Sequence, residues 1–160
     1  MAIWAPALRQ ALKILEAEGL KISSHKHEST APVPRSDPRF SDFAFKDWVD
    51  HLGRHKVYLN TTLRSPMPRS RTEAMLCGVI PVSLDNHDVS RFIQNGVNGF
   101  CSSSIEELAE FCKTVCRDEQ MRKKMSEAAR ATAMDLFNHD RFLTEWVNLV
   151  EETIKYGRIA

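Results

Sequence analysis

Three arginines lie close together before a predicted helix and could bind a diphosphate. Arg64, Arg69 and Arg71 belong to the segment TLRSPMPRSR, and we expect a helix to begin directly after it, with Thr72 as its N-cap. Free N–H groups at a helix N-terminus and the helix dipole attract an anion, and guanidinium groups add bidentate donors. Two prolines stiffen the segment and lower the cost of ordering it, which slightly favours a binding role. A solvated basic loop would otherwise account for these residues equally well.

Glu73 and His87 are the other side chains near this helix that could take part in chemistry. Glu73 could accept hydrogen bonds from vicinal hydroxyls, as a carboxylate beside a βα turn does for a ribose. A first-turn carboxylate that complements the helix dipole is the simpler explanation, and the residues alone favour it. His87 lies in the polar loop 85–88 and could be a general base, a phosphate donor or an ordinary loop residue. Asp88 is equally suited to cap a short helix over 89–94.

A helix, a strand and a loop follow one another in an order that places these residues together. The helix from Thr72 should stop at Gly78, because glycine tolerates a positive φ. The apolar run 79–84 predicts a buried strand. Pro81 should lie near the start of that strand or at an edge of the sheet, because it cannot donate a hydrogen bond. The polar loop then follows the strand's carboxyl end, where ligands bind in open α/β sheets, so we expect the site here.

The rest of the chain alternates predicted helices with strands. Helical periodicity covers 1–18, 42–55, 104–117, 118–137 and 141–156, and short apolar runs at 20–24 and 56–61 predict strands. Residues 25–41 are proline-rich, and we expect them to form a mobile loop. We therefore predict an α/β fold: a Rossmann-like open parallel sheet flanked by helices, with a helical C-terminal tail that covers the sheet's flank. The whole chain, 1–160, is expected to be a single domain.

Composition argues against several other classes of protein. A net charge of +1, from 22 basic and 21 acidic residues, provides no field that would attract nucleic acid or an anionic membrane. No apolar run is long enough to span a bilayer, and no secretory signal is recognised. The four cysteines lack metal-binding spacing and are expected to be free thiols in a reducing cytoplasm. His25, His27 and Glu28 make only a weak zinc pattern, so we expect no metal and no cofactor.

The text from Glu73 onward resembles a known family. The motif EAMxCGxxPV at 73–82, then NGxxGF at 95–100 and an EELAEF helix, is similar to the C-terminal domain of group 1 (family 4, retaining) glycosyltransferases. In those enzymes the text typically reads EAMACGxPVV and then DGxxGF. The resemblance covers roughly 57–137, about half of the chain, with its parts in the right order and at the right distances.

The resemblance implies one half of a GT-B glycosyltransferase, in which two Rossmann-like domains face each other across a cleft. The C-terminal half binds a nucleotide-diphosphate sugar, and the N-terminal half, missing here, binds the acceptor. Transfer would be retaining and independent of metal, and this fragment alone would be inactive as a hexosyltransferase. The full enzyme would be cytoplasmic and not transmembrane, and it could associate peripherally with a membrane. The last helix of this fold often crosses back to the first domain.

Glu73 corresponds to the second glutamate of the family's E-x7-E motif, so the resemblance assigns it the ribose hydroxyls. The first glutamate would fall eight residues earlier, at Ser65, and the family's glycine-rich EGFG segment reads SPMP here. Either Ser65 and nearby arginines such as Arg64 take over part of the contact with the donor sugar, or the donor is held in a different geometry. The resemblance implies that residues around the start of the predicted helix line the diphosphate: Arg69, Ser70, Arg71 and Thr72. No residue is assigned as catalytic.

Two alternatives stay open. A degenerate, non-catalytic domain could serve as a binding or assembly module, since the first glutamate is missing. A nucleotide-sugar epimerase of the non-hydrolysing kind has the same fold, but the EAMxCG text fits it less well. The arginines discriminate: convergence of Arg69 and Arg71 with Glu73 on one pocket favours donor binding, and arginines that point to solvent away from Glu73 favour the binding module.

Overall fold

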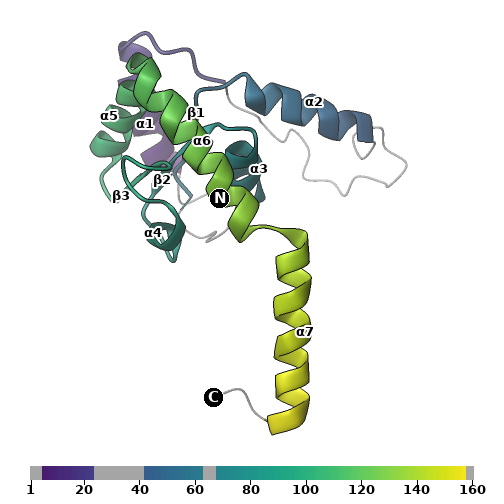
Figure 1. Cartoon of the computed structure of the whole chain (residues 1–160). Coiled ribbons are helices and arrows are strands. Elements are labelled where there is room, and N and C mark those ends of the chain that lie inside the picture. Colours follow the sequence, from purple (N-terminus) through teal and green to yellow (C-terminus); the bar gives the residue numbers. More distant parts are fainter. Residues whose placement is uncertain (1–4, 24–41, 63–67, 158–160) are drawn as a thin grey trace, which may run out of the picture.

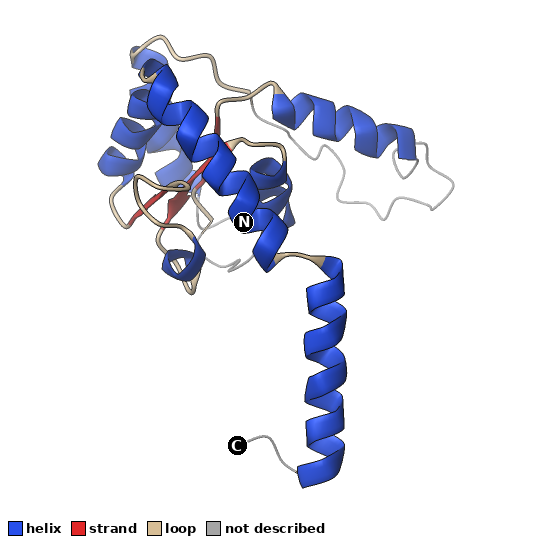
Figure 2. Cartoon of the chain, in the orientation of Figure 1, coloured by secondary structure: helices blue, strands red, loops and turns tan. Residues whose placement is uncertain are grey.

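The computed structural model describes residues 5–23, 42–62 and 68–157 (Figures 1 and 2). The segment 25–41, expected to be a mobile loop, lies outside these residues, and so do Arg64 and Ser65. The predicted site is therefore described from Pro68 onward.

Three parallel strands form a sheet in the order β1-β2-β3. Their bounds are Val57–Asn60 for β1, Ile80–Leu84 for β2 and Phe100–Ser102 for β3. The pairs Leu59–Val82 and Val82–Phe100 set the register. Every residue of β2 is buried, as expected for a central parallel strand covered on both faces. The predicted α/β class with an open parallel sheet is confirmed.

Pro81 and β3 show where the strand predictions succeed and fail. Pro81 is the second residue of β2, near the start of the strand as predicted, and lies opposite Tyr58. β3 is not predicted by the sequence, because three residues are too few to show an alternating pattern. The strand expected over 20–24 is absent in residues 20–23, which have no regular structure. Residues 21–23 are all exposed, Ile22 among them, so this segment has no alternating buried face to hold it against a sheet.

Seven helices occur in the described residues. Their bounds are Ala5–Ala17 for α1, Asp42–Gly53 for α2, Arg69–Leu76 for α3, Val89–Phe92 for α4, Ile105–Arg117 for α5, Glu119–Leu136 for α6 and His139–Tyr156 for α7. Ser104 is the N-cap of α5, since its hydroxyl accepts a hydrogen bond from the backbone N–H of Glu107 at 3.3 Å. Asp118 caps α6 in the same way, by accepting from the N–H of Met121 at 2.9 Å.

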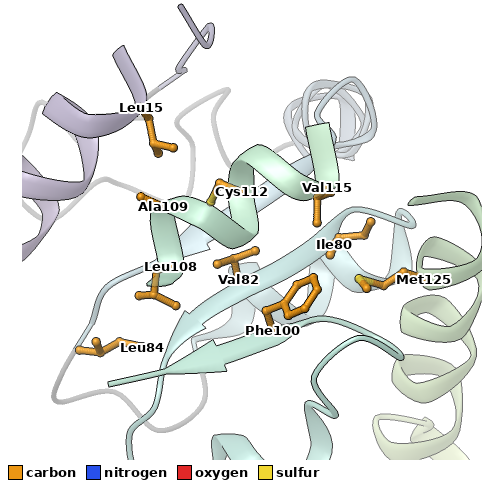
Figure 3. Close-up of a cluster of buried hydrophobic side chains, with 10 residues drawn as sticks. All are labelled: Leu15, Ile80, Val82, Leu84, Phe100, Leu108, Ala109, Cys112, Val115 and Met125. Atoms are coloured by element: carbon orange, nitrogen blue, oxygen red, sulfur yellow. The ribbon is translucent and has the colours of Figure 1, made fainter. Parts of the chain in front are cut away.

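The main hydrophobic core lies between the sheet and α5 (Figure 3). Side chains from alternate positions of β2 meet the inner face of α5, and Phe100 of β3 stacks on Phe111 with ring centroids 4.3 Å apart. α1 packs on α5 and adds Leu15 to this core. The buried members are Leu15, Ile80, Val82, Leu84, Phe100, Leu108, Ala109, Cys112, Val115 and Met125.

Smaller clusters hold α3 between α2 and α6. Ala74 of α3 packs with Leu52 of α2, and Met75 packs with Ala129 and Ala133 of α6. Alanine side chains on α6 let the two helices approach closely at this contact. α3 is therefore fixed on both sides, which sets the direction of its N-terminal end.

The C-terminal helices behave differently from each other. α6 covers the sheet as expected and supplies Met125 to the main core. The expectation that the whole helical tail covers the sheet's flank is wrong for α7, which has no buried residue and extends away from the rest of the described chain (Figure 1). Its apolar side chains, such as Trp146 and Ile154, are exposed. None of the described helices is long and apolar enough to cross a membrane.

Asn98 fixes the turn that leads from α4 into β3. Its buried amide donates to the Phe92 carbonyl at 2.8 Å and to the Thr132 hydroxyl of α6 at 2.9 Å. Its side-chain oxygen accepts from the N–H of Gln94 at 2.7 Å. A single side chain therefore ties this turn to α6.

Replacing Asn98 with alanine should lower the free energy of unfolding by about 2–3 kcal/mol, because buried groups lose their hydrogen-bond partners. Urea unfolding followed by circular dichroism measures the change. The matched control is Asn95→Ala in the same turn, where the side chain is exposed and bonds only to the backbone of Cys101. We expect that control to lose about 1 kcal/mol or less. Equal losses for the two variants would contradict the conclusion that the Asn98 side chain holds this turn against α6.

Candidate functional site

α3 begins at Arg69, three residues before the predicted N-cap. Pro68 holds the N-cap position with φ −65° and ψ 120°, and its carbonyl accepts from the N–H of Arg71 at 2.9 Å. Thr72 is therefore inside the helix, and the prediction that it caps the helix is wrong. Glu73 lies in the second turn, so the helix dipole no longer accounts for its presence. Gly78 follows the C-cap Cys77 with φ +75°, as predicted.

Glu73 is held by two donors from different helices. The indole N–H of Trp48, on α2, donates to Glu73 Oε2 at 2.7 Å. Arg69 Nε donates to Glu73 Oε1 at 3.2 Å, one turn earlier on α3. The Glu73 side chain is 18% exposed and that of Arg69 is 91% exposed. The carboxylate is thus largely enclosed, and Arg69 covers it from the solvent side.

Arg71 points away from this carboxylate and into the protein. It is 1% exposed, and its guanidinium carbon lies 4.6 Å from the centroid of the Phe92 ring on α4. Burial lowers the pKa of Arg71 from its ordinary value. The structure therefore brings Arg69 to Glu73 and separates Arg71 from both. Residues two apart on a helix lie on nearly opposite faces, which is the geometric reason.

Two further predicted residues, Ser70 and His87, lie in the first turn of α3 and in the loop after β2. Ser70 Oγ lies 2.6 Å from the Tyr58 hydroxyl, which ties the first turn of α3 to β1. His87 is exposed and has φ +48° in the loop after β2. Asn86, beside it, donates from its side-chain amide to the Thr62 carbonyl that follows β1. The loops at the carboxyl ends of β1 and β2 are thereby joined where the sequence places the site.

The described part of the chain holds no metal centre, and burial keeps three of its thiols unreactive. No group of three or more histidine, cysteine or acidic side chains comes together there. All four cysteines are free. Burial raises the pKa of the Cys112 thiol to about 12 and raises the pKa values of Cys77 and Cys101 as well. These thiols stay protonated at neutral pH, so they are not nucleophiles.

A separate hollow lies at the opposite end of α3. Its volume is about 660 Å³, and it is lined by Val49, Asp50, Gly53, Arg54, Leu76, Cys77 and Arg130. None of these residues belongs to the predicted site. The hollow faces the C-terminal end of α3, and the Glu73–Arg69 pair lies toward the N-terminal end.

Comparison with known families identifies the domain. The model of the family described as glycosyl transferases group 1 matches residues 43–132, which is more than half of the chain and runs from α2 into α6. The chain belongs to the group 1 glycosyl transferases. The resemblance read from the sequence is thereby confirmed, and glycosyl transfer is the general chemistry of the family. No curated protein matches the chain.

Trp48 is the residue of this glycosyltransferase domain that sequence reasoning missed. Helical periodicity over 42–55 gives Trp48 no role beyond packing, and it does pack beside Leu52. Only the structure shows its indole N–H on Glu73, because the two residues are 25 positions apart. The sequence signal is a tryptophan on the helix before the first strand, and tryptophan usually finds a hydrogen-bond partner when it is buried.

Alanine substitution should destabilise the domain strongly at Arg71 and hardly at all at Arg69. Arg71→Ala should lower the free energy of unfolding by about 3 kcal/mol, because it removes a desolvated cation–π contact and leaves a cavity. Arg69→Ala should change it by less than about 0.5 kcal/mol, since exposed ion pairs contribute little. Urea unfolding of the two variants, side by side, gives both values. A large loss for Arg69→Ala with none for Arg71→Ala would contradict the orientations described above.

Proposed function

We propose that this domain binds the nucleoside diphosphate of a nucleotide-sugar donor at the N-terminal end of α3. The observation that carries the proposal is the Glu73 carboxylate, enclosed beside Arg69 at the carboxyl edge of a parallel sheet in a group 1 glycosyltransferase domain. A carboxylate in that place can accept hydrogen bonds from the two vicinal hydroxyls of a ribose. The diphosphate would then lie at the start of α3.

The first turn of α3 supports the diphosphate part of the proposal. The first N–H groups of a helix have no partner within the helix, and the helix dipole favours an anion there. In α3 the N–H of Arg71 already donates to the Pro68 carbonyl, which leaves those of Arg69 and Ser70 for a ligand. Arg69 is the first residue of the helix and is exposed, so its guanidinium can reach a ligand at this end. Arg71 is excluded from direct contact with the ligand by its burial against Phe92.

Catalysis by this domain would be electrostatic. The leaving nucleoside diphosphate gains negative charge as the glycosidic bond breaks, and preorganised donors stabilise that charge. Removing one such donor typically costs about 3–4 kcal/mol of barrier stabilisation. Retaining transfer without a metal ion, with an acceptor held by a second domain, completes the proposal. The backbone N–H groups of Arg69 and Ser70 and the Arg69 side chain, at the start of α3, are the groups that would act.

A nucleotide-binding module without transferase activity is the second candidate. Two observations favour it: Ser65 stands where the family has the first glutamate of E-x7-E, and Arg71 is turned into the core. Both candidates predict nucleotide binding at Glu73. They differ in whether the domain supports transfer once it is joined to an acceptor-binding half.

The test is calorimetric titration of the 160-residue chain with UDP, GDP and ADP. We expect one of the three to bind, and Glu73→Ala to weaken that binding by about 10- to 100-fold, because a charge-assisted hydrogen bond contributes roughly 1.5–3 kcal/mol. The base of the donor follows from the nucleotide that binds.

Glu119→Ala is the matched control. Glu119 forms the same kind of pair, one helical turn before Lys123 at 3.2 Å, but on α6. Its removal should leave nucleotide affinity unchanged. Equal weakening by the two variants, or no binding of any nucleotide, would refute a donor site at Glu73.

A further inference from the structure

We propose that Trp48 is the positioning residue of the donor site: its indole N–H fixes the Glu73 carboxylate in the orientation that receives the ribose hydroxyls. This inference rests on the proposed function and adds a residue from a different helix to it. Trp48 acts through Glu73 and has no contact with the nucleotide in this account.

The two donors on Glu73 differ in how firmly they are held. Trp48 packs against the cluster formed by Leu52, Ala74 and Val79, and its ring stacks on His51 with centroids 6.0 Å apart. Its hydrogen bond to Glu73 is therefore made by a side chain with little freedom. Arg69 is 91% exposed and is held on this face by its bond to the same carboxylate. One donor is fixed, and the other can move.

The carboxylate keeps lone pairs for a ligand while both donors are in place. An ionised carboxylate has about four lone-pair sites, two on each oxygen. Trp48 and Arg69 occupy one on each oxygen. The other two can accept the vicinal hydroxyls of a ribose. A neutral indole donor orients Glu73 without neutralising its charge, so hydrogen bonds from the hydroxyls stay charge-assisted.

The difference between the donors gives each a role when the nucleotide binds. Arg69 begins α3, where the diphosphate would lie, and its exposed side chain can leave Glu73 for a phosphate oxygen. Glu73 would then lose one of its two restraints. Trp48 remains, so the carboxylate does not rotate away from the ribose. Holding a binding group in place before the ligand arrives removes an entropic cost of binding.

Trp48→Phe tests this role, because phenylalanine keeps an aromatic ring in the cluster and removes the N–H. The ligands are the nucleoside diphosphate that binds the wild-type chain and its 2′,3′-dideoxy analogue. Trp48→Phe should weaken the ribonucleotide roughly five- to tenfold, as expected for one hydrogen bond, and leave the dideoxy analogue unchanged. Trp146→Phe, on the exposed face of α7, is the matched control and should change neither affinity.

Equal weakening of the two ligands by Trp48→Phe would overturn the inference, since it would mean that Trp48 only supports the fold. Unchanged affinity for both would overturn it too. Glu73→Gln separates this failure from failure of the proposed function. If Glu73→Gln removes the preference for ribose and Trp48→Phe does not, the donor site is supported and the positioning role of Trp48 is refuted. If Glu73→Gln also has no effect, or if the wild type binds no nucleotide, both the donor site and the role of Trp48 are refuted.

A second measurement examines the contact without a nucleotide. The indole N–H resonance of Trp48 is assigned by its loss in Trp48→Phe. Glu73→Gln should shift this resonance and speed its exchange with water, because a charge-assisted acceptor is replaced by a neutral one. An unchanged indole resonance would overturn the inference independently of nucleotide binding.

Discussion

The turn at Gly78 is the constraint on which the placement of the site depends. α3 ends there, and β2 begins two residues later, so this turn sets where the helix lies on the sheet. Gly78 has φ +75°, and a Cβ at this position would lie 2.7 Å from Ser126 Oγ of α6. The Ser126 hydroxyl donates to the Gly78 carbonyl at 2.6 Å. A residue with a side chain would therefore be strained in its backbone and would displace the Ser126 hydroxyl from its hydrogen bond.

α3 extends back from this turn for eight residues, and its length brings its N-terminal end to the carboxyl edge of the sheet. α3 runs about 12 Å along its axis at 1.5 Å per residue, so its first turn lies beside the loops that follow β1 and β2. Tyr58 and Ser70 join strand and helix at that end. The helix then divides its side chains by face. Arg69 and Glu73 lie together on one side, and Arg71 and Met75 are buried on the other.

The sequence predicts β1, β2 and most helices because local signals there agree with packing. Ser104 and Asp118 are both capping residues and both cap. At α3 the local signal and the packing disagree. Thr72 is a good N-cap residue, but the burial of Arg71 and Met75 extends the helix to Pro68, and a first turn needs no capping side chain to form. α7 forms where its helical periodicity predicts a helix. Periodicity does not show what an apolar face packs against, so the exposure of α7 could not be predicted.

The candidate site could be predicted only in part. Motif text identifies Glu73, and helix geometry could have separated Arg71 from Arg69 had the start of α3 been known. The contact with Trp48 depends on how α2 packs against α3, and no local pattern encodes that arrangement. The site is built by α2 and α3, and the sequence reveals only the part that α3 contributes.

The most direct test of a donor site at the start of α3 is the nuclear magnetic resonance spectrum of the ¹⁵N-labelled chain during titration with the nucleoside diphosphate that it binds. A donor site there predicts the largest shifts at the amides of 69–73 and at the indole N–H of Trp48, with smaller shifts in the loop around His87. Shifts concentrated around Asp50, Arg54 and Arg130 would place the ligand in the hollow at the other end of α3 and would contradict the account.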